Sequence, residues 1–167
     1  DVLGPLGNEF SEPAADEASL LVAGGIGVAG LRFLAQTLRG ADREVHALVG
    51  ARSADLLLHH TFPPPTDDGR MTVEVATDDG SEGPPGFVTE LLERELAAEA
   101  AARVYACGPT PMMQRAAEIT EAAGLPCIVS LENRMACGFG VCLGCAVPRS
   151  DSEQGYHLVC RDGPVFE

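Results

Sequence analysis

The sequence predicts an α/β protein in which a five-stranded parallel sheet is flanked by helices and followed by a small C-terminal module. Three observations support this prediction. Short apolar segments alternate with amphipathic ones from residue 19 to residue 131, as expected for parallel strands joined by right-handed crossovers, with helices on both faces. A glycine-rich turn, GGIGVAG, follows the first apolar segment. Close to the C-terminus, MACGFGVCLGCAVP places three of the six cysteines within nine residues.

The hydrophobic periodicity places the elements in order. Five short apolar strands are expected, over 19–24, 44–50, 71–77, 103–108 and 125–131. Four helices are expected, over 28–39, 54–59, 86–98 and 111–123. Three of them place apolar residues on one face: Leu31, Leu34 and Leu38; Phe87, Leu91 and Leu92; and Met112, Ala116 and Ile119. Beyond residue 132 only one further strand is expected, over 156–160.

Composition divides the chain into three parts. Residues 1–17 are rich in glycine, proline and acidic residues without periodicity, so we expect a linker or the edge of another domain. Residues 18–132 carry the strand–helix alternation and form the predicted nucleotide-binding domain, and 133–167 form the cysteine module. The sequence begins at Asp1 without an initiator Met, and its first segment, DVLGPLGNEF, looks like part of a folded domain. We therefore expect the chain to be the C-terminal part of a longer protein.

Charge and hydropathy exclude some classes of protein. The net charge of −14 disfavours a nucleic-acid or anionic-membrane partner, because phosphates would be repelled. No apolar run approaches the roughly 20 residues that a membrane span needs, and no signal segment opens the chain. We therefore expect a cytoplasmic protein.

The turn GGIGVAG predicts a phosphate-binding site. Glycines between a strand and a helix let the backbone approach a pyrophosphate, and the free N–H groups at the helix start attract its charge. Gly24, Gly25 and Gly27 are the candidate ligands. An ordinary dinucleotide fold closes its second strand with an acidic residue that holds the ribose, but here that strand closes on GARS, 50–53. Arg52 in this segment could favour a 2′-phosphate.

The ends of the third and fourth strands should complete the dinucleotide site, since ligands of such sheets bind outside the carboxyl ends of the strands. The third strand ends at Thr77 and Asp78, and the fourth at Cys107, Gly108 and Pro109. Two plainer interpretations stay open: TDDGSEGPPG is also typical of a turn, and the cysteine could be a small buried residue at a strand end. We predict no catalytic residue.

The cysteine cluster predicts an iron–sulfur site. Cys137, Cys142 and Cys145 have the spacing C-x4-C-x2-C and Cys160 follows, which is the plant-type ferredoxin order for a 2Fe–2S cluster. The glycines between them let the loop curl and turn N–H groups toward the sulfurs. Zinc sites favour two separated C-x2-C pairs, and disulfides are rare in chains without a secretory signal.

These segments together resemble the electron-transfer subunit family of bacterial dihydroorotate dehydrogenases, in the ferredoxin-reductase superfamily, over nearly the whole chain. The segments are GPLGNEF, GGIGVAGL, ATDDGSEGPPGFVTELL, YACGPTPMM and SLENRMACGFGVCLGCAVP with VCRDGPVF. The resemblance implies an NAD-binding domain that needs no ribose-binding acid, and it makes residues 1–17 the end of a flavin-binding barrel. Gly30 departs from the family, which usually carries proline there. The small subunit of NADH-dependent ferredoxin:NADP oxidoreductases is similar but typically has Asp at the position of Cys137.

The resemblance also implies a function. Electrons from dihydroorotate, oxidised on an FMN-containing catalytic subunit, would pass through the 2Fe–2S cluster and FAD to NAD⁺, in pyrimidine biosynthesis and within a heterotetramer. FAD would bind the N-terminal barrel that this chain lacks, so we expect the chain alone not to transfer electrons from NADH at a useful rate. Two alternatives stay open: an NAD(P)H-dependent reductase module with another acceptor, and a zinc-stapled interaction module without a redox role.

Overall fold

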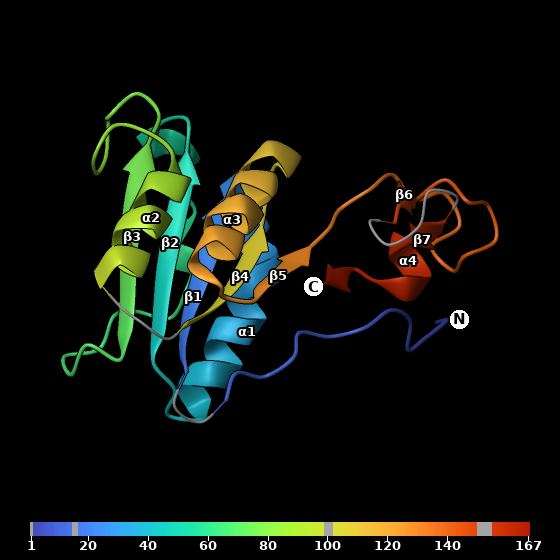
Figure 1. Ribbon diagram of the computed structural model, residues 1–167, viewed down its shortest axis with the longest axis horizontal. Coiled ribbons are helices and arrows are strands. Elements are labelled where there is room, and N and C mark those ends of the chain that lie inside the picture. The colour runs from blue at the N-terminus through green and yellow to red at the C-terminus, as the bar shows by residue number, and fades with distance from the viewer. Residues whose placement is uncertain (1, 15–16, 99–101, 150–154) are drawn as a thin grey trace.

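The computed structural model describes residues 2–14, 17–98, 102–149 and 155–167, so residues 1, 15 and 16 of the predicted linker lie outside the described part. Six strands form one sheet in the order β3-β2-β1-β4-β5-β8 (Figure 1). Their bounds are β1 Ala18–Gly24, β2 Val45–Ala51, β3 Met71–Thr77, β4 Ala102–Cys107, β5 Cys127–Ser130 and β8 Val165–Phe166. The first five are parallel, which confirms the predicted sheet. β8 adds an antiparallel edge strand that the sequence pattern did not predict.

Helices cover both faces of the sheet, as predicted. α1 (Val28–Gly40) lies on one face, and α2 (Val88–Ala98) and α3 (Thr110–Ala123) lie side by side on the other (Figure 1). Because successive side chains of a strand point to opposite faces, each strand contributes to two cores. Leu21 and Ala23 of β1 pack toward α1, whereas Leu20 and Val22 pack toward α2 and α3. We call these five parallel strands and three helices the sheet domain.

Two details of the predicted helices are wrong. Residues 54–59 form no α-helix but two short 3₁₀ turns, Ala54–Leu56 and His59–Thr61, because Leu57 between them is extended. This segment is apolar because it covers the core, where Leu57 is buried. Phe87 is 64 % exposed rather than buried, since it precedes the first helical residue of α2.

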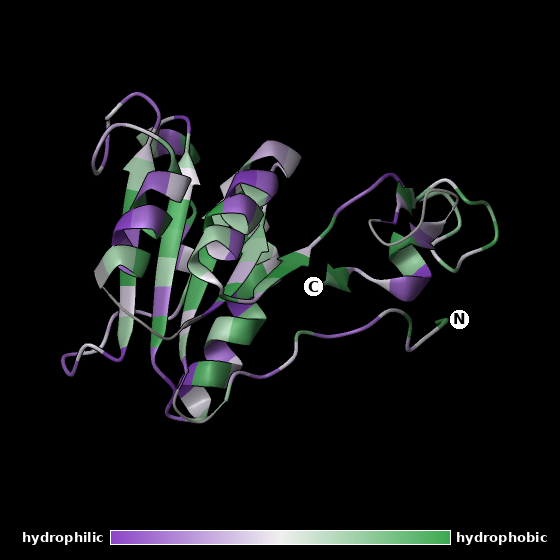
Figure 2. Cartoon of the chain, viewed as in Figure 1, coloured by the Kyte–Doolittle hydropathy of each residue, from purple (hydrophilic) through white to green (hydrophobic). Residues whose placement is uncertain are grey.

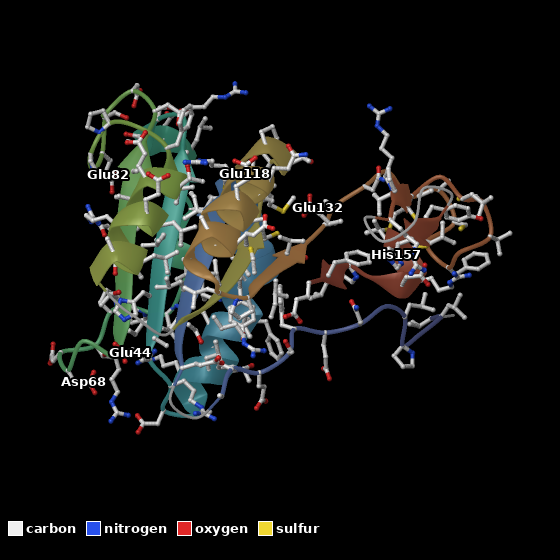
Figure 3. The ribbon with its side chains drawn as sticks, in the orientation of Figure 1. Glu44, Asp68, Glu82, Glu118, Glu132 and His157 are labelled. Atoms are coloured by element: carbon white, nitrogen blue, oxygen red, sulfur yellow. The ribbon has the colours of Figure 1, made fainter. Side chains whose placement is uncertain are left out.

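Most of the C-terminal residues fold apart from the sheet domain as a second small unit, the cysteine module (133–149 and 155–167; Figure 1), whose last strand, β8, joins it to the edge of the sheet. A hairpin of β6 (Ala146–Pro148) and β7 (Tyr156–Leu158) leads into a single turn, α4 (Val159–Asp162). The predicted strand at 156–160 thus ends at Leu158. Figure 3 labels His157 in this module and Glu132 on the segment that connects it to the sheet domain.

The N-terminal segment 2–14, which we call the strap, runs between the two units (Figure 1). Its Phe10 ring packs edge-on against Tyr105 of β4, and the Tyr105 hydroxyl donates to Ser11 O at 2.8 Å. At its other end, the backbone N–H of Asn8 donates to Gly163 O at 2.7 Å. Among the described helices none is both long and apolar enough to cross a membrane.

Candidate functional site

The order of the strands changes direction at one point of the sheet, and a crevice is expected there. β2 and β3 extend the sheet to one side of β1, and β4 and β5 extend it to the other, so the switch point lies between β1 and β4. Ligands of open α/β sheets bind outside the carboxyl ends of the strands at such a point. The two predicted glycine turns, after Gly24 and after Cys107, meet there.

Packing explains most of the glycines at the switch point. A Cβ on Gly27 would lie 2.1 Å from Cys107 O, and one on Gly108 would lie 2.9 Å from the backbone of Gly24. A Cβ on Gly24 would lie 2.6 Å from the sulfur of Met112. These glycines let the ends of β1 and β4 and the start of α3 touch.

Gly25 is different, because it has φ +52° and nothing within 4 Å of the Cβ it lacks. Its backbone therefore faces open space at the start of the 3₁₀ turn Gly25–Gly27, which runs into α1. Of the predicted glycines, Gly25 is the one whose missing side chain leaves room for a ligand. The sequence pattern did not separate it from the packing glycines.

A cavity of about 750 Å³ opens beside this turn. It is large enough for a sizeable organic ligand. It is lined by the ends of β1 and β2, by residues that follow β3 and β4, and by residues of α2 and α3, with Gly24, Gly25, Asp78 and Pro109 among the residues predicted from sequence. Sequence reasoning missed other lining residues: Gly50, Ala51, Leu56, Phe87, Val88, Thr89, Glu90, Glu93, Pro111, Met112 and Arg115. Gly27, Thr77, Cys107 and Gly108 do not line it.

The cavity walls combine an aromatic face with charges of both signs. Phe87 stands exposed at its edge, where an aromatic ring can stack on a base. Arg115 is paired with Glu93 at 2.6 Å, across α3 and α2. Arg52, at the end of β2, has no ion pair among the described residues, and Asp78 is exposed beside it. Among the described residues the wall thus offers the guanidinium of Arg52 and the carboxylates of Asp78 and Glu90, none of them in an ion pair.

Thr77 organises the loop below the cavity. It is fully buried, its hydroxyl donates to Glu82 O at 2.8 Å, and the N–H of Glu82 donates back to it at 3.1 Å. Asp78 N–H donates to Ala51 O at 3.0 Å and ties the end of β3 to the end of β2. The turn interpretation of TDDGSEGPPG is therefore correct for this loop, while Asp78 also reaches the cavity.

Cys107 is buried at the end of β4. Burial raises the pKa of its thiol, with the charge of Glu132 adding to the effect. The sulfur would lie 3.0 Å from a Cβ on Gly30, so it packs against the first turn of α1. The structure gives this residue a packing role as a neutral thiol.

The four cysteines of the predicted cluster lie together in the cysteine module as two neighbouring pairs. Cys142 N–H donates to the sulfur of Cys137 at 3.4 Å. The sulfurs of Cys145 and Cys160 lie 3.2 Å apart, and all four are free thiols. The pairs are close enough that the charge of Cys137 acts on both members of the second pair.

Backbone N–H groups surround the sulfurs. Those of Cys142, Phe139 and Val141 donate to Cys137 and lower its pKa to about 6. The N–H of Cys160 donates to the sulfur of Cys145 at 3.5 Å and lowers the pKa of Cys145, while the hydrogen bond with Cys145 raises the pKa of Cys160. The N–H groups of the loop therefore favour the thiolate forms of Cys137 and Cys145.

The loop conformation that aims these N–H groups is uncommon. Gly138 and Gly140 have φ of 77° and 88°, and Leu143 adopts φ 59° without being glycine. Non-glycine residues in this region are strained, and such strain gathers at ligand sites. In the described part of the chain no three His, Cys, Asp or Glu side chains surround one point as the ligands of a single ion would. Two adjacent thiol pairs fit a binuclear cluster, in which each iron takes two thiolates.

The cysteine loop and the segment just before it carry four exposed apolar side chains, which we call the apolar rim. Phe139, Val141 and Leu143 are 46 %, 71 % and 51 % exposed, and Met135 is 48 % exposed. Figure 2 shows this rim as a hydrophobic loop at the outer edge of the module. The sequence pattern did not predict this rim, although the alternation of apolar residues with cysteines was a usable signal.

Comparisons with known proteins find family models for both parts of the chain. Residues 21–118 match the family model of the oxidoreductase NAD-binding domain, and residues 132–167 match that of the iron–sulfur cluster binding domain of dihydroorotate dehydrogenase B. The electron transfer subunit of dihydroorotate dehydrogenase B (NAD(+)) from Caldanaerobacter subterraneus is 40 % identical over 99 % of this chain and 63 % of its own length. That from Geobacillus kaustophilus is 42 % identical over 99 % of this chain and 62 % of its own length.

A solved structure of an NADH-dependent reduced ferredoxin-NADP oxidoreductase, studied for flavin-based electron bifurcation, is also similar. The match has a TM-score of 0.80 and 35 % identity, and it covers 99 % of this chain and 57 % of that chain. The chain thus spans about three fifths of the length of the curated relatives it matches. With both family models on one chain, it belongs to the oxidoreductases that join an NAD-binding domain to the iron–sulfur cluster binding domain of dihydroorotate dehydrogenase B.

Proposed function

We propose that this chain carries electrons between a 2Fe–2S cluster held by Cys137, Cys142, Cys145 and Cys160 and a nicotinamide dinucleotide bound at the switch point, as part of a dihydroorotate dehydrogenase. The observation that carries the proposal is the pairing of four thiols within one module, surrounded by N–H donors. Its chemistry fits iron–sulfur ligation. The domain division proposed is a flavin-domain edge in 1–17, an NAD-binding domain in 18–132 and a cluster module in 133–167.

The residues of this chain have distinct tasks in that function. The N–H groups of Gly25 and of the following turn donate to the pyrophosphate, while Asp78 and Pro109 border the cavity that takes the rest of the dinucleotide. Four buried residues, Gly24, Gly27, Thr77 and Cys107, and the half-buried Gly108 hold the strand ends in register around it. In the module, the four thiolates hold the cluster and the loop N–H groups offset its negative charge.

The two sites need a converter between them, because a nicotinamide exchanges two electrons as hydride and a 2Fe–2S cluster exchanges one at a time. FAD on a preceding barrel would supply that conversion. The expected donor is an FMN-containing catalytic subunit in a cytoplasmic heterotetramer, which oxidises dihydroorotate during pyrimidine biosynthesis; the relatives named above support this assignment. The apolar rim around the cluster loop is the surface that such a partner would cover.

The test is to purify the protein anaerobically from its native cells with whatever binds to it, and to add dihydroorotate or NADH while recording the visible and EPR spectra. We expect a reddish-brown protein whose cluster is reduced by dihydroorotate. A Cys142→Ser variant should lose the cluster spectrum, and Cys127→Ser, which changes a cysteine of β5, should keep it.

Other outcomes identify the alternatives. Reduction by NADH with no response to dihydroorotate would indicate a reductase module with another acceptor. A colourless protein that contains zinc after growth with ample iron would indicate the interaction module without a redox role.

A further inference from the structure

Arg161 follows the last cluster cysteine directly and lies against the cluster loop. A Cβ on Gly140 would lie 3.1 Å from Cδ of Arg161, 3.5 Å from its Cβ and 3.7 Å from its Cγ. The aliphatic stem of the arginine therefore occupies the space beside Gly140, and the absence of a side chain there lets the two come close. The contact joins the middle of the loop to α4.

The guanidinium of Arg161 is held in place by its neighbour. Nε donates to Asp162 Oδ1 at 2.8 Å, and a second nitrogen donates to Asp162 Oδ2 at 3.3 Å. Asp162 is itself fixed, since its Oδ2 accepts the N–H of Leu158 at 2.8 Å and its carbonyl accepts Asn8 Nδ2 at 3.2 Å. A two-point pair of this kind orients the cation as well as binding it.

This cation lies on the Cys160 side of the cluster loop. Arg161 directly follows Cys160 in α4, and its stem lies beside Gly140 of the loop. The stem contact and the charge thus act next to both the loop and the last cluster cysteine. Arg161 thus brings a full positive charge into contact with the loop.

We propose that Arg161 is a positioning residue for the iron–sulfur cluster: its stem holds Gly140 in the loop, and its charge raises the reduction potential of the cluster. The inference rests on the proposed function of the four cysteines. Reduction adds one electron to the cluster and no proton needs to move, so a nearby fixed cation favours the reduced form. Asp162 offsets part of this charge, and the net effect is therefore modest.

A purely structural role predicts a different result. An exposed arginine–carboxylate pair contributes little to stability. Arg161 is 59 % exposed, so as a surface pair alone its loss would leave the potential unchanged. The measurement must therefore be the potential and not activity.

The experiment is an EPR-monitored redox titration of the chain loaded with iron and sulfide, with Arg161→Gln, Arg161→Lys and Asp162→Asn. Arg161→Gln should lower the equilibrium constant for cluster reduction by about three- to tenfold, where tenfold is 59 mV for a one-electron couple. Arg161→Lys should stay within threefold of the parent chain. Asp162→Asn should raise the constant, because it removes the opposing charge.

Arg94→Gln is the matched control. Arg94 is 53 % exposed and paired with Glu74, but Glu74 lies on β3, at the opposite edge of the sheet from β8. Its loss should leave the potential unchanged.

Three results would overturn the proposal. The first is an unchanged potential in Arg161→Gln, and the second is a shift of Arg161→Gln and Asp162→Asn in the same direction. The third applies if Arg161→Gln does not retain the cluster. In that case Asp162→Asn is the remaining test, and a fall in its equilibrium constant for cluster reduction would overturn the proposed role of the charge. A parent chain without any 2Fe–2S signal would refute the proposed function itself.

Discussion

The sheet domain and the cysteine module are stabilised in different ways. The sheet domain has two cores, one on each face, and its central strand β1 is buried from Ser19 to Gly24. Among the described residues of the cysteine module, one small buried cluster forms its own core, made of Cys145, Leu158, Val159 and Cys160. Two of those four are proposed ligands. Small units with so little apolar burial usually need a metal or other cross-link. The comparison therefore predicts that the sheet domain folds by itself and that the module depends on its cluster.

The largest effect should follow from removing a cluster ligand. Cys145→Ala takes away a ligand that is also half of the buried cysteine pair, so the module should lose both its visible absorbance and its fold. Hydrogen exchange should become fast at 156–166 while the β1 and β4 amides stay protected. Cys127→Ala, at a half-buried cysteine of β5, is the control and should leave the module intact. Persistent protection of the module without absorbance would show that it folds without its cluster.

The second effect tests the sheet domain. Gly27→Ala would place a methyl group 2.1 Å from Cys107 O, so the ends of β1 and β4 must separate. We expect a loss of about 3 kcal/mol in unfolding free energy, measured by denaturant titration of far-UV circular dichroism. The cluster absorbance should not change, because the module lies elsewhere.

Gly25→Ala separates packing from binding. Its side chain would meet no atom within 4 Å, and only the positive φ penalises it, by about 1–2 kcal/mol. The methyl group would enter the cavity, so NADH affinity measured by calorimetry should fall although stability falls less than in Gly27→Ala. If Gly25→Ala bound NADH normally, the dinucleotide would have to lie away from this turn.

The same two regions show how far the sequence was informative. The five parallel strands were predicted to within two residues at each end, because each of them is a short segment rich in apolar residues between turn signals. β8 was missed because it contains only Val165 and Phe166, and two residues are too few to show the alternation of apolar and polar residues that identifies a strand. Phe87 was assigned to the buried face because it lies four residues before Leu91, but the helix begins one residue after it.

The sites divide in the same manner. Spacing along the chain was enough to group the four cluster cysteines and the glycine turns. The cavity walls come from residues at or just after the ends of four strands and from two helices, so residues such as Leu56 and Arg115 become neighbours only through the topology. Nor could spacing tell Gly25, which faces open space, from Gly27, which is needed for packing.

The fourth prediction concerns pH and again involves the sheet domain. Burial raises the pKa of Tyr105 to about 12, whereas an unfolded tyrosine titrates near 10. The folded phenol keeps its proton to higher pH, so this contribution is complete below pH 10 and is lost as pH rises from 10 to 12. The loss should approach about 3 kcal/mol of unfolding free energy.

Tyr105→Phe should remove that alkaline slope at the cost of about 1 kcal/mol at pH 7, from the hydrogen bond to Ser11 O. Tyr156→Phe, at a tyrosine of β7 that is 52 % exposed, is the matched control. Denaturant titrations at pH 8, 10 and 11.5 measure both. An equal slope in Tyr105→Phe would assign the alkaline loss to other groups.

The smallest effect should come from the strap, and it tests whether the module also depends on residues outside it. Asn8 Nδ2 donates to Val165 O at 2.7 Å and to Asp162 O at 3.2 Å, and its Oδ1 accepts the N–H of Val165 at 2.9 Å. Asn8→Ala removes all three bonds and leaves the Val165 groups without them. We expect β8 to open more readily by about 1–2 kcal/mol, seen as faster exchange of the Val165 amide.

The control for the strap is Glu9→Ala, at an exposed neighbour on the same segment, which should leave that amide unchanged. Because β8 pairs with β5 as well as with Asn8, the sheet domain should keep its own protection in Asn8→Ala. Faster exchange at Val165 together with an unchanged cluster spectrum would mean that the strap secures only the module's attachment to the sheet. Loss of cluster absorbance in Asn8→Ala would extend its role to the cluster itself, through the Asp162 carbonyl that it binds beside Arg161. Unchanged exchange at Val165 would show that these three hydrogen bonds are not what holds β8, and that its pairing with β5 is sufficient.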